Sequence, residues 1–332
     1  PCAPTATVLD EYNAIAAYFA GRGFLAVNPD HIGMAGFGGG GGTHHAYLHG
    51  EQIAVGSWDA VRAARALLAS GELDTGLRIG DTVSIWGASQ GGHGALLAER
   101  YAPYYAPEFA VPGVVAAVPP VSAHYLAELD GTTGSLTTAT ILAASLATQS
   151  SWYGLGDLGE LLTDEAPHHY AAAFLDEILD PDECASDRYP EEGAAEHEDL
   201  FQPGFLAAAE AGDWGELEPW GCFVDHSGAH TTSVAALRQT PTLTVFGELD
   251  PVVPFGAQQP GLEALCDDGA SVEVLRCIGA PHVEAPLWSV SEQIGWFLDR
   301  LDGAAPDGTF GGTCALPEPV CCSGTPADIC VP

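Results

Sequence analysis

Short, predominantly apolar segments alternate with longer segments of helical periodicity along most of this chain. The apolar segments have the length and composition of strands buried on both faces of a sheet. They are FLAVN (24–28), TVSIW (82–86), VVAAV (114–118), TLTVF (242–246) and SVEVL (271–275). Helices are predicted at 8–20, 57–69, 90–101, 256–266 and 289–301. This alternation predicts an α/β fold in which a mostly parallel sheet is flanked by helices on both faces.

Residues 119–241 separate two of the predicted strands, which is far more than an ordinary crossover connection. This long segment contains alanine-rich helical stretches at 138–148, 169–179 and 204–211, separated by polar, acidic breaks. We therefore expect an inserted helical cap or lid at 123–235. The sheet domain would then consist of 1–122 and 236–313, followed by a cysteine-rich tail at 314–332.

The chain is strongly acidic, with 45 acidic residues against 9 basic ones and a net charge of −36. Phosphate backbones would be repelled by such a surface, so we expect no nucleic-acid partner. The acidity fits either adaptation to salt or the drift of a secreted acidic protein. No segment approaches the roughly 18 consecutive apolar residues of a membrane-spanning helix.

Nine cysteines are many for a cytosolic enzyme, and four of them, Cys314, Cys321, Cys322 and Cys330, lie near the end of the chain. No pair of CxxC motifs indicates a zinc site, so disulfides formed in an oxidising compartment are expected. The protein is therefore predicted to be extracellular, periplasmic or attached to the cell surface. The odd count leaves one thiol free, paired with another chain, or paired outside this sequence. The sequence begins at Pro1 without a signal peptide, and we expect a true N-terminus further upstream.

A G-x-S-x-G motif, Gly87-Ala88-Ser89-Gln90-Gly91, lies between a predicted strand and a predicted helix. This is the context of a nucleophile elbow, a tight turn that presents a serine hydroxyl above the edge of the sheet. Side chains at positions 87 and 91 are expected to collide with neighbouring backbone. The start of the following helix favours negative charge, so the backbone N–H of Gln90 is a candidate oxyanion donor.

A serine hydroxyl needs a base and an acid, and this fold supplies them in the order serine, acid, histidine. Asp250 follows the predicted strand 242–246, and His282 follows the predicted strand 271–275. Both lie just beyond the carboxyl ends of strands, where sites of open α/β sheets form. We therefore predict a catalytic triad of Ser89, Asp250 and His282. Glu248, two residues before Asp250, is the alternative acid.

The remaining histidines are weaker candidates for chemistry. The glycine-rich run at 36–42 lacks the Gly-Lys-Ser/Thr ending of a phosphate-binding loop, so no nucleotide is expected. The other histidines are expected to pack or to be solvated rather than to bind a metal, and neither a metal nor another cofactor is predicted. They are His93 in the helix after the elbow, His31 beside Asp30, His44, His45 and His49 near the glycine-rich run, and His168 and His169 in the cap.

Several motifs together give a family resemblance. They are CAPT (2–5), GFLAVNPDHIGM (23–34), GEQIAVGSWDAVRAARAL (50–67), GASQGGHGAL (87–96), ERYAPYYAPEF (99–109), ELDPVVP (248–254) and GAPHVEAP (279–286). In this order they resemble the secreted α/β-hydrolase lipases of the fungal lipase-A type and their bacterial relatives. The resemblance is weak in the cap and absent in the cysteine-rich tail.

The resemblance implies an α/β-hydrolase fold, a cap over the active site, an acyl-enzyme mechanism and fatty-acyl ester substrates. It also implies a disulfide from Cys2 to a cap cysteine, for which Cys184 and Cys222 are the candidates. In the family the second oxyanion donor and the first strands precede the Cys-Ala-Pro motif, which here means before Pro1. We therefore expect the chain to associate with its own missing N-terminal segment.

The favoured function is a secreted, lipase-like serine carboxylic-ester hydrolase acting on a small-molecule or lipid ester, including esters at a lipid–water interface. An acyltransferase and a polyester or aromatic-ester hydrolase use the same triad and remain alternatives. A catalytically silent binding protein that keeps the fold is a further alternative, against which the complete triad argues.

Overall fold

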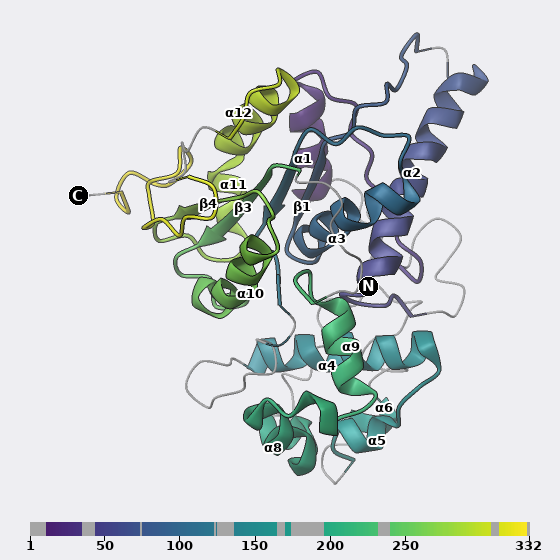
Figure 1. Ribbon diagram of the computed structural model, residues 1–332, viewed down its shortest axis with the longest axis vertical. Coiled ribbons are helices and arrows are strands. Elements are labelled where there is room, and N and C mark those ends of the chain that lie inside the picture. Colours follow the sequence, from purple (N-terminus) through teal and green to yellow (C-terminus); the bar gives the residue numbers. More distant parts are fainter. Residues whose placement is uncertain are drawn as a thin grey trace. The chain divides into compact units, whose positions relative to one another are not determined.

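The fold is described from a computed structural model of the 332-residue chain (Figure 1). The structure describes residues 11–34, 44–73, 75–122, 124, 136–164, 170–173, 196–231, 240–306 and 312–330. It divides into two compact units. One comprises Pro1–Gln52, Asp59–Leu73 and Ala123–Ser227, and the other comprises Ile53–Trp58, Asp74–Ser122 and Gly228–Pro332.

The second unit contains a parallel sheet of four strands. They are β1 (Ile85–Ala88), β2 (Val114–Ala117), β3 (Thr242–Gly247) and β4 (Val272–Cys277), in the spatial order β1-β2-β3-β4. Every residue of β2 and β3 is buried, as expected for strands covered on both faces. These four strands confirm four of the predicted segments, with boundaries shifted by at most three residues.

Helices flank this sheet (Figure 1). They are α3 (Gln90–Tyr105), α10 (Phe255–Asp267), α11 (Glu284–Trp288) and α12 (Val290–Leu301). Helix α3 packs on β1 and β2, α12 contacts β2, and α10 and α11 contact β4. The predicted helix at 289–301 corresponds to α12, and α11 is an additional short helix before it. The α/β architecture predicted from the sequence is confirmed.

One acidic residue lies within the buried strand β4. Glu273 is only 1% exposed, and its Oε2 accepts a hydrogen bond of 2.7 Å from Nε1 of Trp296. The guanidinium of Arg300, on the same helix α12, lies 3.5 Å from that carboxylate oxygen. A buried charge is tolerated when it is paired and hydrogen-bonded. This pairing explains how a glutamate fits in a buried strand whose residues other than Glu273 and Arg276 are apolar.

The prediction of a buried strand at 24–28 is wrong. These residues form no strand in the structure, and the side chains of Leu25 and Val27 are 47% and 36% exposed. An apolar run becomes a buried strand only if neighbouring strands pair with it. No segment among the described ranges pairs with residues 24–28.

The second predicted helix begins earlier than expected. Helix α2 spans Gly50–Ser70, and its N-cap is His49, whose Nδ1 accepts a hydrogen bond from Gln52 N. Ser57, the first residue of the predicted helix at 57–69, lies inside α2, where its hydroxyl donates to the backbone oxygen of Ile53.

The described part of the first unit is mostly helical. It contains α1 (Glu11–Ala20), α4 (Leu136–Tyr153), α5 (Leu158–Leu161), α6 (Tyr170–Ala173), α7 (His197–Leu200), α8 (Pro203–Ala211), a 3-10 turn (Trp214–Glu216) and α9 (Trp220–Ser227). The predicted helices at 138–148 and 204–211 are confirmed as parts of α4 and α8. Most of the predicted helix at 169–179 and the glycine-rich run at 36–42 lie outside the described residues. The predicted boundaries of the cap stay a prediction. None of the described helices has both the length and the apolarity needed to cross a membrane.

Three disulfides hold the cysteine-rich tail. They are Cys266–Cys314, Cys277–Cys322 and Cys321–Cys330. The first two attach the tail to α10 and β4, and the third closes a short loop within it. Cys222 carries a free thiol, so it is not the partner of Cys2. Cys2 and Cys184 lie outside the described residues. The prediction of a disulfide-bonded chain is confirmed.

Candidate active site

Ser89 occupies the sharp turn between β1 and α3. Its backbone angles, φ 54° and ψ −120°, lie in a region that residues other than glycine rarely adopt. The turn is held because Ser89 N donates to Ala117 O over 2.9 Å, while Ser89 O accepts from His93 N over 3.0 Å. Strained serines of this kind are typical of the nucleophile elbow. The hydroxyl is thereby presented at the carboxyl end of β1.

Two glycines make this turn possible, but they are not the pair expected from the motif. A Cβ at Gly87 would overlap the backbone of Gly91, and a Cβ at Gly92 would lie 2.6 Å from Ala117 O. A Cβ at Gly91 would meet nothing within 4 Å. The expected collision at position 91 is therefore wrong, because Gly91 is exposed on α3, while Gly92 faces the end of β2.

Two alanine substitutions should separate these roles. Gly87→Ala is expected to lower the free energy of unfolding by about 2–3 kcal/mol, because a methyl group must be forced against backbone. Gly91→Ala should leave it unchanged or raise it by up to about 1 kcal/mol, because alanine is the better helix former. Urea unfolding of the two variants measures the difference. Equal destabilisation by both would contradict the geometry of the elbow.

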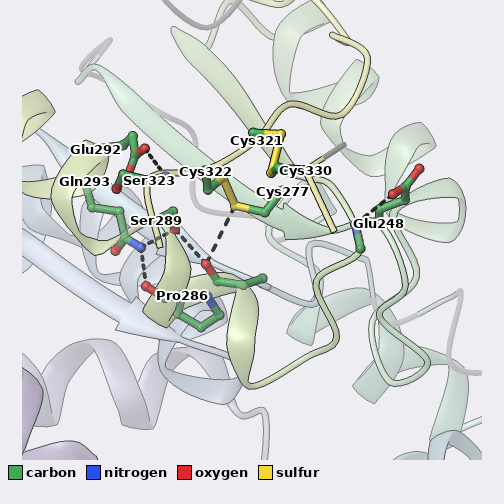
Figure 2. Close-up of a disulfide and its surroundings, with 12 residues drawn as sticks. Glu248, Cys277, Pro286, Ser289, Glu292, Gln293, Cys321, Cys322, Ser323 and Cys330 are labelled. Atoms are coloured by element: carbon green, nitrogen blue, oxygen red, sulfur yellow. Dashed lines mark hydrogen bonds between the residues drawn. A yellow bond between two sulfur atoms is a disulfide. The ribbon is translucent and has the colours of Figure 1, made fainter. Parts of the chain in front are cut away.

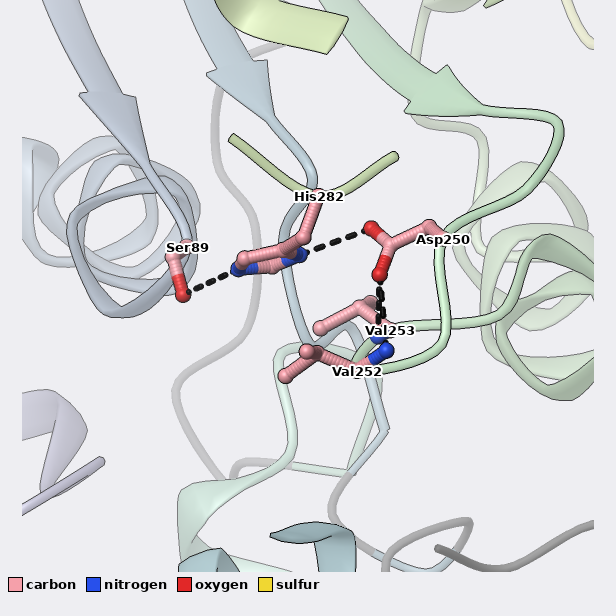
Figure 3. Close-up of polar contacts among 5 residues, drawn as sticks. All are labelled: Ser89, Asp250, Val252, Val253 and His282. Atoms are coloured by element: carbon pink, nitrogen blue, oxygen red, sulfur yellow. Dashed lines mark hydrogen bonds and ion pairs between the residues drawn. The ribbon is translucent and has the colours of Figure 1, made fainter. Parts of the chain in front are cut away.

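A hydrogen-bonded relay connects three side chains (Figure 3). Nε2 of His282 lies 2.9 Å from Oγ of Ser89, and Nδ1 of His282 lies 2.7 Å from Oδ2 of Asp250. The carboxylate of Asp250 is completely buried, and the imidazole of His282 is 15% exposed. The structure thus brings together the serine, the histidine and the acid that the sequence predicts as a triad.

The two oxygens of Asp250 have different partners, which fixes the orientation of the carboxylate. Oδ1 accepts hydrogen bonds from the backbone N–H groups of Val252 and Val253, at 2.8 and 2.9 Å. Oδ2 is directed at Nδ1 of His282 (Figure 3). A carboxylate can only accept here, so Nδ1 carries the proton and Nε2 presents its lone pair to the Ser89 hydroxyl. In this arrangement His282 is able to remove the proton of Ser89.

Gln90 is the first residue of α3 and follows Ser89 directly. Its backbone N–H therefore lies at the positive end of the helix dipole, where negative charge is stabilised. Its role as an oxyanion donor stays a prediction. The same holds for the second donor, which the resemblance places upstream of Pro1.

Glu248, the alternative acid, does not contact His282 in the structure. Its side chain is exposed and accepts a hydrogen bond of 2.8 Å from Gly279 N. Asp250, rather than Glu248, is therefore the acid that the structure brings to the histidine.

The other histidines lie elsewhere. His93 is buried within α3, and His45 and His49 are buried in the first unit. Nδ1 of His45 is hydrogen-bonded to Ile32 O. His168 and His169 lie outside the described residues. Within the described ranges, no group of three or more histidine, cysteine, aspartate or glutamate side chains could hold a metal ion.

His45 makes the stability of the protein depend on pH. Burial lowers its pKa to about 4, although the hydrogen bond to Ile32 O opposes this shift. The imidazole of His45 therefore takes up a proton near pH 6.5 in the unfolded chain but only near pH 4 in the folded chain. Between these pH values the unfolded chain binds more protons, so the free energy of unfolding falls as the pH decreases. The loss approaches about 3 kcal/mol at the acid end. His45→Gln should remove this part of the pH dependence in denaturant unfolding at pH 7 and pH 4.5. A constant difference between variant and wild type would contradict it.

The backbone donors to Asp250 are functional groups that reasoning from the motif did not include. The sequence signal for them is Asp-Pro-Val-Val, in which an aspartate begins a turn and accepts from N–H groups two and three residues later. Such a turn buries and orients the carboxylate before the histidine is considered.

The fold and the relay define the class of protein: an α/β-hydrolase with a serine at the elbow and a histidine and an aspartate after later strands. Among solved structures, a protein of Legionella pneumophila described as a hydrolase is 18% identical, with a TM-score of 0.71, covering 89% of this chain and 74% of its own. Lipase A of Candida antarctica in its closed state is 17% identical, with a TM-score of 0.60, covering 86% and 62%.

A mutant of the rice cell wall degrading esterase LipA of Xanthomonas oryzae is 20% identical, with a TM-score of 0.60, covering 77% of this chain and 67% of its own. At these identities the structures establish the α/β-hydrolase fold. The chain spans less than two thirds of the Candida enzyme. A comparison with curated protein sequences finds no significant match.

A comparison of the sequence with family models finds one similarity that agrees with this fold. Residues 3–152, a little under half of the chain, match the secretory lipase family. The match includes the elbow with Ser89 and confirms the resemblance predicted from the motifs. Together with the lipase and esterase structures, this match supports a carboxylic-ester hydrolase of the lipase and esterase class.

Proposed function

We propose that the chain is a secreted serine hydrolase that cleaves fatty-acyl esters through an acyl-enzyme on Ser89. The observation that carries the proposal is the pair of hydrogen bonds that joins Ser89 to His282 and His282 to Asp250. The match to the secretory lipases supports the class of substrate, and the disulfides support an extracellular location.

The proposed reaction has two halves. Ser89 Oγ attacks the ester carbonyl while His282 Nε2 takes its proton, and the carbonyl electron pair moves to oxygen. The tetrahedral intermediate collapses, the C–O bond to the alcohol breaks, and His282 donates its proton to the leaving alcohol. Water then attacks the acyl-enzyme with His282 again as the base, which releases the acid and restores Ser89.

Asp250 and the start of α3 stabilise the charges that form in this reaction. The buried carboxylate lies against Nδ1, so it stabilises the imidazolium and keeps Nε2 facing Ser89. The N–H of Gln90 is the proposed first oxyanion donor, at the positive end of the helix dipole. A segment upstream of Pro1 is proposed to supply the second donor.

A series of p-nitrophenyl esters from acetate to octanoate tests the substrate class. We expect kcat/KM to rise with chain length, because a fatty-acyl site gains about 0.8 kcal/mol for each buried methylene. A preference for acetate over octanoate would contradict a lipase and leave an esterase of short or aromatic acids. Running the series with an added alcohol separates hydrolysis from acyl transfer, since only an acyltransferase would form mainly the new ester.

A further inference from the structure

The cysteine-rich tail pairs with the outer edge of β4 through an isolated parallel bridge. Val320 N donates to Arg276 O over 2.8 Å, and Ile278 N donates to Val320 O over 2.9 Å. These bonds form a parallel bridge between Val320 and Cys277. Next to this bridge, the disulfide between Cys277 and Cys322 joins the tail to the last residue of β4 (Figure 2), and both cysteines are buried.

The next two residues of the tail bind a different part of the chain. The backbone N–H and the hydroxyl of Ser323 donate to the two carboxylate oxygens of Glu292 on α12, over 2.7 and 2.8 Å (Figure 2). Gly324 N donates to Trp288 O, at the end of α11, over 2.8 Å. A Cβ at Gly324 would lie 2.7 Å from Cα of Trp288, so the two backbones are in direct contact.

His282 lies between these two attachment points. The loop that carries it leaves β4 after Cys277 and enters α11 at Glu284. Residues 320–324, which we name the tail brace, therefore hold the chain on both sides of the histidine loop. The entry to α11 is close to the disulfide as well, since Sγ of Cys277 lies 3.9 Å from Ala285 O (Figure 2).

We propose that Cys322 and Ser323 are positioning residues for His282. By fixing the end of β4 relative to α11 and α12, the tail brace holds the imidazole at hydrogen-bonding distance from Ser89. This inference rests on the proposed function of Ser89 and His282. A base displaced by about 1 Å loses up to about 100-fold in rate, so a modest shift of the loop has a large effect on turnover.

A pair of matched double variants separates positioning from general stability. Cys277→Ala/Cys322→Ala removes the disulfide of the tail brace, which closes a loop of 45 residues. Cys266→Ala/Cys314→Ala removes the disulfide to α10, which closes a loop of 48 residues. Because loop length sets the entropic effect of a disulfide, both variants should lose similar stability.

The readout is steady-state hydrolysis well below the melting temperature of either variant. Loss of the brace disulfide should lower kcat by about 10-fold or more with KM changed less than about 2-fold, because the base moves while the substrate site remains. The α10 control should keep the wild-type kcat. Equal values of kcat in the two double variants would overturn the proposal.

A second series covers the case in which the first double variant does not fold. Glu292→Ala removes the acceptor of Ser323 without creating a buried cavity, and Glu292→Gln keeps one oxygen acceptor. We expect a lower kcat for Glu292→Ala and partial recovery for Glu292→Gln, with KM unchanged. A wild-type kcat in Glu292→Ala overturns the positioning role. Turnover that persists in Ser89→Ala would instead defeat the proposed function, so the two failures are distinguishable.

Discussion

Replacing Ser89 with alanine is expected to lower kcat for p-nitrophenyl esters by about 10⁶-fold, to the level left by binding and oxyanion stabilisation alone. The proposed nucleophile is the hydroxyl whose Oγ lies 2.9 Å from His282 Nε2. Alanine removes this oxygen and fits the space that the serine side chain occupies. The protein should therefore remain folded with an unchanged melting temperature.

Ser57→Ala is the matched control for this substitution. Ser57 donates its hydroxyl to Ile53 O within α2 and takes no part in the relay. It should keep the wild-type kcat. A Ser89→Ala protein that retains more than about a thousandth of wild-type turnover, measured after purification from a host without background esterase, would contradict the assignment.

Asp250→Asn is expected to lower kcat by about 10⁴-fold with little change in KM. The structure gives the reason. Val252 N and Val253 N both donate to Oδ1, so the asparagine must turn its carbonyl oxygen toward them and its NH₂ group toward His282. Nδ1 of His282 then has to accept, which places the proton on Nε2 and blocks the transfer from Ser89.

Glu248→Gln is the control that separates the two candidate acids. Glutamine keeps an oxygen to accept the hydrogen bond from Gly279 N, and the residue does not contact His282. Its kcat should remain within about 2-fold of wild type. The opposite result, with a small effect of Asp250→Asn and a large effect of Glu248→Gln, would make Glu248 the acid. Steady-state kinetics between pH 6 and pH 9 measures both variants.

The sheet and the relay were predictable because local patterns carry them. Apolar runs followed by Gly87-Ala88-Ser89, Asp250 and His282 place three polar groups at the carboxyl edge of a parallel sheet, whatever the rest of the chain does. The composition of β4 also indicated a buried strand in spite of Glu273. The partners of the Glu273 carboxylate, Trp296 and Arg300, lie on α12 and could be identified only from the fold.

The errors arose where the outcome depends on tertiary partners. FLAVN (24–28) has the composition of a buried strand, but burial requires neighbouring strands that no apolar pattern specifies. His49 caps α2 through a ring nitrogen, a role usually filled by serine, threonine, asparagine or aspartate. The need for glycine at position 92 rather than 91 depends on how closely α3 approaches Ala117.

The tail illustrates the same limit. Its cysteines predicted disulfides, but four closely spaced cysteines do not specify their partners. Only the fold brings Cys322 to the end of β4 and Ser323 to Glu292. The attachment of the tail on both sides of the His282 loop could therefore not have been inferred from the sequence.

The most direct test of the central claim is labelling with a fluorophosphonate ester, followed by intact-mass measurement and peptide mapping. Ser89 Oγ should attack phosphorus and expel fluoride while His282 takes the proton, leaving one adduct on Ser89 and no turnover. His282→Ala should react far more slowly. An adduct on another residue, or full turnover after Ser89 is labelled, would contradict the account.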